Sequence, residues 1–163
     1  MINNAHPAIE SCTFRAFEGV LHPAIDIVNG GVDMYGCAFI ENWMGQSAII
    51  SALDSQLTIA ESEFIDCGQY GSIKAVGSYV DISETRFERT ELGFRTRMTA
   101  IELVDCCGSV IDCAFQKLAV IPSYWENAAI TVYTINSSNE EICLNILNCT
   151  FDQLESTIQA SAI

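Results

Sequence analysis

The sequence predicts an all-β fold, a right-handed parallel β-helix of about six coils with three short strands in each. Three observations predict it: a six-fold repeat that ends in Phe, a second apolar repeat at a nearly constant distance from that Phe, and the absence of helical periodicity. In a β-helix each coil buries its inward side chains only against neighbouring coils. A repeat of roughly 20 to 50 residues is therefore its signature.

The first repeat is an apolar residue, two variable residues, a small residue, one variable residue and then Phe. Its small and Phe positions are Cys12 and Phe14, Cys37 and Phe39, Ser62 and Phe64, Thr85 and Phe87, Cys113 and Phe115, and Cys149 and Phe151. Successive Phe residues are 25, 25, 23, 28 and 36 positions apart, and six of the eight Phe residues fall in this column. The alternative, a β-sandwich, has no reason to keep Phe at a fixed position, so the column favours stacked coils.

Two further short strands complete each coil. One begins with a small residue and continues with β-branched alternation, in residues 24–27, 48–50, 72–76, 100–103 and 129–132. Its first Ile lies 14, 15, 14, 14 and 21 residues before the next Phe. The other strand is the period-2 alternation of 32–34, 57–59, 80–82 and 144–146. Such short β-branched runs between Gly, Ser, Asn or Asp are typical of strands. With coils of about 24 residues stacked about 4.8 Å apart, we expect a rod on the order of 30 Å long.

Two stretches interrupt the spacing and predict loops: the polar residues 136–141 and the Arg-rich residues 90–99. Residues 1–163 are predicted to form a single domain that begins and ends in mid-coil. We expect a segment or repeat unit of a longer solenoid, or copies that stack end to end, because an open solenoid end exposes strand edges. Frayed ends on an ordinary monomer are the alternative.

These repeats resemble the right-handed β-helix repeat superfamily, which includes pectate lyases, polygalacturonases, phage tailspikes and surface adhesins. The resemblance covers almost the whole chain, from Ile9 onward. It implies the fold and leaves the function open, because the same coil serves all of these roles.

The composition limits the possible partners. Seven Lys and Arg residues face 21 Asp and Glu residues, for a formal net charge of −14. Nucleic acids and anionic lipids need a basic surface, so neither is an expected partner. No stretch of the sequence reaches the roughly 18 continuous apolar residues of a membrane span. Residues 1–8 lack the apolar core of a secretory signal.

Six of the eight cysteines fall in two columns. The pairs that adjacent coils would stack are Cys12 with Cys37, Cys107 with Cys143, and Cys113 with Cys149. The coil spacing lies within the Cα range of a disulfide, so each pair predicts either a disulfide between coils or a ladder of buried thiols. Cys67 and Cys106 have no evident partner, and the spacing of the cysteines does not match a metal site.

Two glycosylation sequons begin at Asn136 and Asn148, and the first lies in the polar insertion, where a glycan would fit. Tyr124 and Trp125 form an aromatic pair that could stack on a sugar; packing beneath a loop is equally consistent with the sequence. The sequons are slight support for an extracellular setting.

The candidate catalytic residues would lie on the outward ladder of the first strand, which we expect to be Asp26, Ile50, Lys74, Glu102 and Thr131. Lys74 and Glu102 would be neighbours, and a surface ion pair between coils explains them better than an active site does. The superfamily's lyases use carboxylate-bound Ca²⁺ with a base, and its hydrolases use a pair or triad of Asp. The polygalacturonase signature is absent from the sequence, so we expect no catalytic residues, no metal and no cofactor.

Basic residues gather in one region, interleaved with glutamates: Arg86, Arg89, Arg95 and Arg97. The region is either a solvated loop with compensating charges or a contact loop that docks against an acidic neighbouring copy.

The sequence therefore favours a non-enzymatic structural rod. This would be a subunit or segment of an extracellular filament, stalk or cell-surface adhesin that associates end to end. The alternative is a polysaccharide-binding or polysaccharide-degrading protein, similar to a lyase or a hydrolase.

Overall fold

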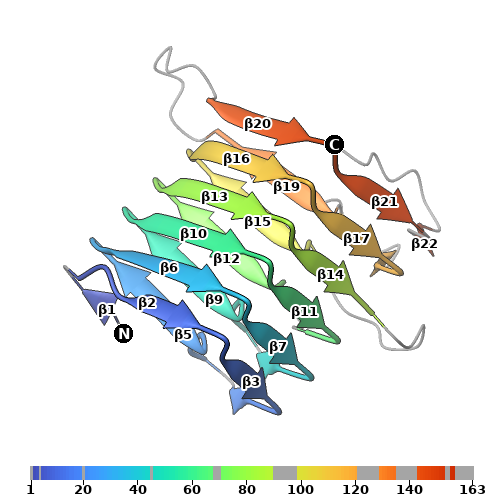
Figure 1. Ribbon diagram of the computed structural model, residues 1–163, viewed down its shortest axis with the longest axis horizontal. Helices are drawn as coiled ribbons and strands as arrows, with labels where there is room; N and C mark the ends of the chain where they lie inside the picture. Colours follow the sequence, from blue (N-terminus) through green and yellow to red (C-terminus); the bar gives the residue numbers. More distant parts are fainter. Residues whose placement is uncertain are drawn as a thin grey trace.

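The computed structural model describes residues 2–3, 5–19, 21–44, 46–67, 71–89, 99–120, 129–134, 143–152 and 155–156. Every regular element in these residues is a β-strand, and strands of successive coils pair in parallel to form three sheets (Figure 1). The prediction of an all-β parallel β-helix is confirmed. Because the described residues contain no helix, none of them forms a helix that could cross a membrane.

Each of the three sheets has six strands, one from each level of the stack. Sheet A contains β1 (Ile2–Asn3), β5 (Ile25–Val28), β9 (Ile50–Leu53), β12 (Ile73–Val76), β15 (Ile101–Val104) and β19 (Ile130–Tyr133). Sheet B contains β2 (Ala8–Glu10), β6 (Gly31–Tyr35), β10 (Gln56–Ala60), β13 (Tyr79–Ser83), β16 (Cys107–Ile111) and β20 (Leu144–Leu147). Sheet C contains β3 (Thr13–Arg15), β7 (Ala38–Ile40), β11 (Glu63–Ile65), β14 (Arg86–Glu88), β17 (Ala114–Gln116) and β21 (Thr150–Asp152).

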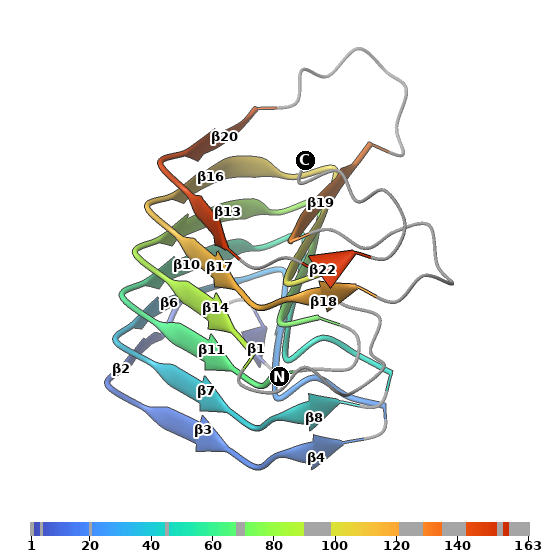
Figure 2. The ribbon, with the colours of Figure 1, turned by 90° about the vertical axis from the view of Figure 1, so that its right-hand side faces the viewer.

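Two short strand pairs follow sheet C along the chain (Figure 2). They are β4 (Glu18–Gly19) with β8 (Trp43–Met44), and β18 (Ala119–Val120) with β22 (Glu155–Ser156). A coil can therefore carry a fourth short strand, which the three-strand prediction did not include.

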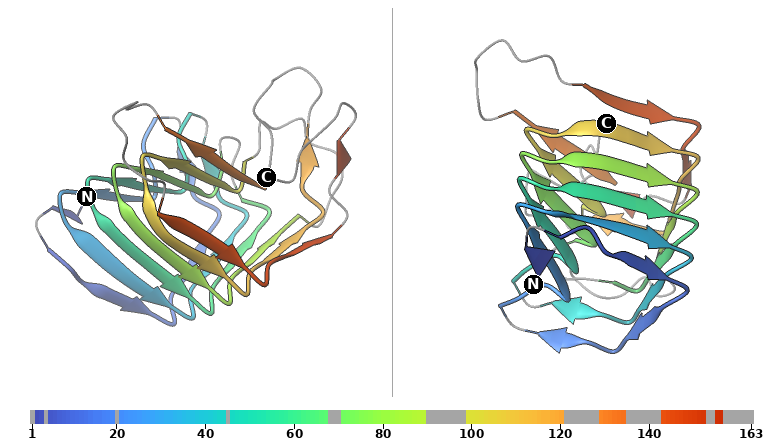
Figure 3. Two further views of the ribbon diagram at one scale, coloured as in Figure 1. Left: turned by 90° about the horizontal axis from the view of Figure 1, so that it is seen from above. Right: turned by 60° about the vertical axis from the view of Figure 1, so that its left-hand side comes forward.

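About four coils are regular, which is fewer than the six expected. Coils β5–β7, β9–β11, β12–β14 and β15–β17 each contain strands of four, five and three residues. The first coil has shorter strands in sheets A and B, and the last coil includes residues 135–142, which lie outside the described residues. Figure 3 shows the regular coils stacked as parallel rungs between these two end coils.

The core is built from columns of like side chains that run along the stack. Along the Phe column, Phe14, Phe39, Phe64, Phe87, Phe115 and Phe151 stack in order. Neighbouring ring centroids lie 4.6 to 5.1 Å apart, and their planes differ by 3 to 7°. The parallel register imposes this geometry, because equivalent residues of adjacent coils sit one strand spacing apart.

The register corrects one alignment made from the sequence. Ile25 pairs with Ile50 and not with Ile49, so Ser51 occupies the outward position that we expected for Ile50. Two adjacent isoleucines satisfy the apolar pattern in either register, which is why the pattern alone was ambiguous. With Ile50 as the first strand residue, the distance to Phe64 becomes 14 residues, as in three other coils.

Left-handed corner residues separate the strands. At the corner between sheets B and C the residues with positive φ are Ser11, Gly36, Glu61, Glu84, Asp112 and Asn148, with φ from 48 to 59°. Each one directly precedes the small residue of the Phe repeat. A left-handed residue turns the chain sharply and is uncommon outside Gly, Asn and Asp, which explains the short polar side chains at several of these corners.

The small residue after each corner points inward and satisfies backbone groups. Ser62 Oγ donates a hydrogen bond to the Ala60 carbonyl at 2.9 Å and accepts one from the Cys37 N–H at 3.1 Å. Thr85 repeats the donation, to the Ser83 carbonyl at 2.8 Å. Only a small side chain with a donor fits here, so Ser, Thr and Cys share this column.

Candidate functional site

The three cysteine pairs differ in their chemistry. Cys107 and Cys143 form a disulfide between the last two coils, with a Cα–Cα distance of 4.7 Å. The members of the other two pairs are free thiols, and they stack in the inward column of Ser62 and Thr85. Cys37 Sγ donates to the Ile9 carbonyl of the coil before it at 3.3 Å, and Cys149 Sγ donates to the Val110 carbonyl at 3.5 Å. These thiols thus take over the role of the hydroxyls.

Cys67 and Cys106, which had no evident partner in the sequence, belong to corresponding columns at the other two corners. Cys106 follows Ser55 and Ser78, whose hydroxyls donate to carbonyls two residues earlier, and its own Sγ donates to the Val104 carbonyl at 3.2 Å. Cys67 Sγ donates to the Phe39 carbonyl at 3.0 Å. A small polar residue directly after a turn residue is the sequence signal that could have placed both.

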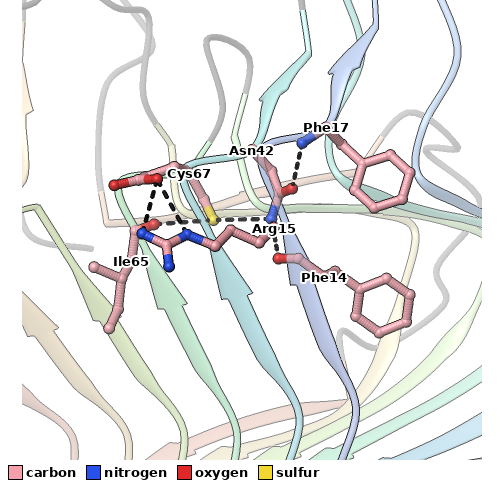
Figure 4. Close-up of polar contacts among 7 residues, drawn as sticks. Phe14, Arg15, Phe17, Asn42, Ile65 and Cys67 are labelled. Atoms are coloured by element: carbon pink, nitrogen blue, oxygen red, sulfur yellow. Dashed lines mark hydrogen bonds and ion pairs between the residues drawn. The ribbon is translucent and has the colours of Figure 1, made fainter.

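Asn42 links the first coil to the rest of the stack. Its Oδ1 accepts a hydrogen bond from the Phe17 N–H at 3.0 Å, and its Nδ2 donates to the Phe14 carbonyl at 2.9 Å (Figure 4). On its other side Nδ2 lies 3.9 Å from Cys67 Sγ. The side chain of Asn42 is fully buried, so these bonds satisfy polar groups that water does not reach.

Burial favours the protonated form of three thiols, those of Cys67, Cys106 and Cys113. It raises the pKa of Cys67 to about 12 and that of Cys113 to about 11, from an ordinary value of 9.0. The pKa of Cys106 is raised for the same reason. A nucleophilic or metal-binding cysteine needs a low pKa, so these thiols have the character of structural groups.

The structure contradicts the expected contact loop at Arg89. Its side chain is only 3% exposed, and its guanidinium carbon lies 6.0 Å from the centre of the Trp43 ring. Burial lowers the pKa of Arg89, while the negative charge of Asp66 acts to raise it. Arg89 lies one residue after β14, at the corner position that Glu41, Asp66 and Lys117 occupy in other coils. Those three side chains are not buried, so the inward placement is particular to Arg89.

The other basic residues of that region are placed differently. Arg86 forms ion pairs with Glu63 of the preceding coil at 2.7 Å and with Glu88 at 3.2 Å. Its charge is therefore compensated within the molecule. Arg95 and Arg97 lie outside the described residues.

The candidate catalytic ladder on sheet A is Asp26, Ser51, Lys74, Glu102 and Thr131. Lys74 Nζ lies 2.8 Å from Glu102 Oε1; the Lys74 side chain is exposed and the Glu102 side chain is half-buried. The pair has the geometry of a surface ion pair between coils, for which stabilisation is small. In the part of the chain that the structure describes, no group of three or more His, Cys, Asp or Glu side chains could hold a metal ion.

A second outward ladder, on sheet B, was not anticipated. Its central column contains Asp33, Thr58, Asp81, Ser109 and Asn145. Ser109 Oγ donates to Asp81 Oδ1 at 2.7 Å. At the other end of the column, His6 Nε2 lies 3.1 Å from Asp33 Oδ1, and this contact holds the pKa of Asp33 below its usual value. These residues are the variable positions of the third-strand repeat.

Two tyrosines flank that ladder on the same outer face. Tyr35 is 49% exposed and Tyr79 is 50% exposed. A hydrogen bond to Glu61 raises the pKa of Tyr35. The outer face of sheet B thus combines exposed aromatic rings with carboxylates and hydroxyls.

The remaining candidates are only partly described. Asn148 is an exposed corner residue with a φ of 53°, directly before the half-buried Cys149. Asn136, Tyr124 and Trp125 lie outside the described residues.

The two end coils leave core positions partly open. Ile9 and Phe14 of the first coil and Ile146 and Phe151 of the last coil are half-buried, although they belong to columns that are fully buried in between. The first coil is otherwise exposed throughout residues 5–18.

No protein-family model, curated protein or solved structure matches this chain. The fold therefore stands on its own geometry, and the likeness to the right-handed β-helix superfamily remains one of repeat pattern.

Proposed function

We propose that this chain is a structural, non-enzymatic β-solenoid whose end coils bind further coils. It would serve as a subunit or segment of an extracellular filament, stalk or cell-surface adhesin. The observation that carries the proposal is the half-open core at both end coils, where Phe14 and Phe151 terminate an otherwise buried column. A further coil laid on either end would extend every column and bury these side chains.

The end coils also offer backbone groups for pairing. In the described residues, β2 and β3 are edge strands at one end of sheets B and C, and β20 and β21 are edge strands at the other. An edge strand presents a row of N–H and C=O groups that can pair with another strand. Head-to-tail contact between such edges is heterologous and produces an open rod.

The disulfide supports the extracellular part of the proposal. Disulfides persist in oxidising compartments and are rare in the cytosol. The bond between Cys107 and Cys143 holds the last coil, which would carry the contact to the next coil. An oxidising setting would therefore strengthen that end of the rod.

Electron microscopy of the protein at physiological salt, with a mass measurement on the same sample, tests the proposal. We expect rods that lengthen with protein concentration and a mass that is a multiple of 17.8 kDa. Discrete particles of 17.8 kDa at every concentration would contradict it.

A second candidate function is polysaccharide binding on the outer face of sheet B, and the exposed Tyr35 and Tyr79 favour it. Aromatic rings stack on the apolar faces of sugars, and the Asp33–Asn145 column offers hydrogen-bonding groups. Because Asp33, Asp81 and Glu61 lie on or beside this face, neutral glycans should bind more tightly than polyuronates. Glycan-array binding with and without Ca²⁺, and a cleavage assay on the bound glycans, test this candidate and its enzymatic version.

A further inference from the structure

We propose that two copies join in register, so that the first coil of one copy lies on the last coil of the next and each residue column continues across the joint. This inference rests on the proposed function and adds the contacts that define the joint. It commits to a second copy of this chain as the occupant of the end coils.

The sheet C register aligns the aromatic ends. Phe14 and Phe151 are the two ends of one column, and each has a single ring neighbour from that column within the molecule. In the joint, Phe14 of one copy stacks on Phe151 of the other. The Phe column then continues without a break at the spacing of about 5 Å that parallel coils impose.

The inward thiol column continues in the same way. Inside the molecule Cys37 Sγ donates to the carbonyl of Ile9, one coil before, at 3.3 Å. Among the described residues no coil precedes that of Cys12, and its exposed Sγ lies 3.2 Å from the carbonyl of Glu10. In the joint, the carbonyl of Ile146 takes the place that Ile9 has for Cys37, because Ile9 and Ile146 share a column of sheet B.

Charge complementarity selects this register. Arg15 and Asp152 are the first and last residues of another column of sheet C, so the joint brings them together. Within the molecule, opposite charges on adjacent coils already pair in this manner: Lys117 with Glu88 at 3.2 Å, and Arg86 with Glu63 at 2.7 Å. Arg15 lies 3.3 Å from Glu41 of its own copy, so in the joint its guanidinium would lie between two carboxylates.

Three further neighbours across the joint are compatible. Thr13 meets Thr150, Ala8 meets Asn145, and Glu10 meets Leu147.

Charge reversal at the joint tests the register. We expect Arg15→Asp and Asp152→Arg each to raise the critical concentration for rod formation roughly tenfold, because attraction becomes repulsion at every joint. An equimolar mixture of the two variants should form rods again, since every alternating joint then pairs opposite charges.

Lys74→Asp is the matched control, because it changes the charge by the same amount as Arg15→Asp in the middle of the stack. Both replaced side chains are exposed, so circular dichroism should show folded protein in each case. If wild-type rods form and neither end variant impairs them, the register is wrong while the proposed function stands. If the wild-type chain stays monomeric at all concentrations, the joint between copies and the proposed function both fail.

Discussion

The central coils and the end coils contribute residues to the same columns, but the side chains are buried to different degrees in the two regions. Phe39, Phe64, Phe87 and Phe115 are fully buried, whereas Phe14 and Phe151 are only half-buried. The strands that carry all six residues have the same length and the same register. Burial in this molecule therefore depends on whether a coil has neighbours on both sides, as expected for a stack of nearest-neighbour contacts.

The polar columns show the same difference. In the central coils the thiols of Cys67 and Cys113 are buried and bonded to carbonyls of an earlier coil. In the first coil the thiol of Cys12 is exposed and bonded within its own coil. In the part of the chain that the structure describes, the central coils thus have a neighbour on both sides, and the end coils have a neighbour on one side.

Removal of a central Phe ring should cause the largest loss of stability. Phe64→Ala should lower the free energy of unfolding by about 3–5 kcal/mol, because it leaves a cavity between two stacked rings. Phe14→Ala should cost less than half as much, since Phe14 has one stacked neighbour in its column and is partly exposed. Urea denaturation of dilute, monomeric protein measures both. Equal losses would mean that the end coil is as well covered as the centre.

The disulfide should be nearly as important for the last coil. Replacing Cys107 and Cys143 by Ser removes a cross-link over 36 residues, for which we expect a loss of about 2–4 kcal/mol. The loss should appear first as faster hydrogen exchange in β20 and β21, because end coils open locally. Reductant should reproduce the effect in the wild-type chain and leave the double variant unchanged; a reductant effect on the double variant would point to another disulfide.

Asn42 tests how firmly the first coil is attached. Asn42→Ala removes the bonds to the Phe17 N–H and the Phe14 carbonyl, so we expect a loss of about 1–3 kcal/mol. Hydrogen exchange should increase mainly in β3 and β4. Asn145→Ala, at an exposed position, is the control and should change stability little. A loss spread evenly over all coils would show that the stack unfolds as one unit.

Thiol labelling compares the two regions without changing stability. At pH 8 the exposed Cys12 should react readily with a maleimide. Cys67, whose pKa burial raises from 9.0 to about 12, should have about a thousandfold less thiolate than an ordinary cysteine, even before its inaccessibility is counted. Mass spectrometry of labelled peptides measures both rates, and denatured protein provides the reference. Rapid labelling of Cys67 in the native protein would contradict its buried placement.

The raised pKa of the Cys67 thiol also makes the stability of the fold depend on pH. Because the folded-state pKa of Cys67 lies above its ordinary value, folding favours the protonated thiol, and its stabilising effect is complete below about pH 9. Stability should then fall as the pH rises from about 9 toward 12. Cys67→Ser should weaken this alkaline dependence.

Much of the fold was accessible from the sequence because a solenoid repeats its rules. The Phe column, the three strands of a coil and the stacking of Lys74 on Glu102 all follow from residues at constant spacing. The choice between Ile49 and Ile50 could not be made in this way, because either isoleucine satisfies the pattern. Strand pairing selects Ile50, and thereby places Ser51 outward.

The candidate sites were less accessible for physical reasons. Arg89 is a charged residue beside other arginines, which suggested a surface loop, but its side chain is buried beside Trp43, unlike the residues at the same corner of other coils. Cys67 and Cys106 showed no partner in the sequence because their hydrogen-bond acceptors are backbone carbonyls, which every residue carries. The sheet B ladder lies at positions that the repeat leaves variable, so no column of identical residues marked it.

By itself, the sequence determined that the chain forms stacked parallel coils with an aromatic column. The apolar residues recur at a constant spacing, and stacking buries the inward side chains of each coil against its neighbours. Only the tertiary structure decided which cysteines form a disulfide, which cation is buried and which columns remain open at the ends. The reason is that these properties depend on what the neighbouring coil presents at the same position, and neighbouring coils are about 25 residues apart along the chain.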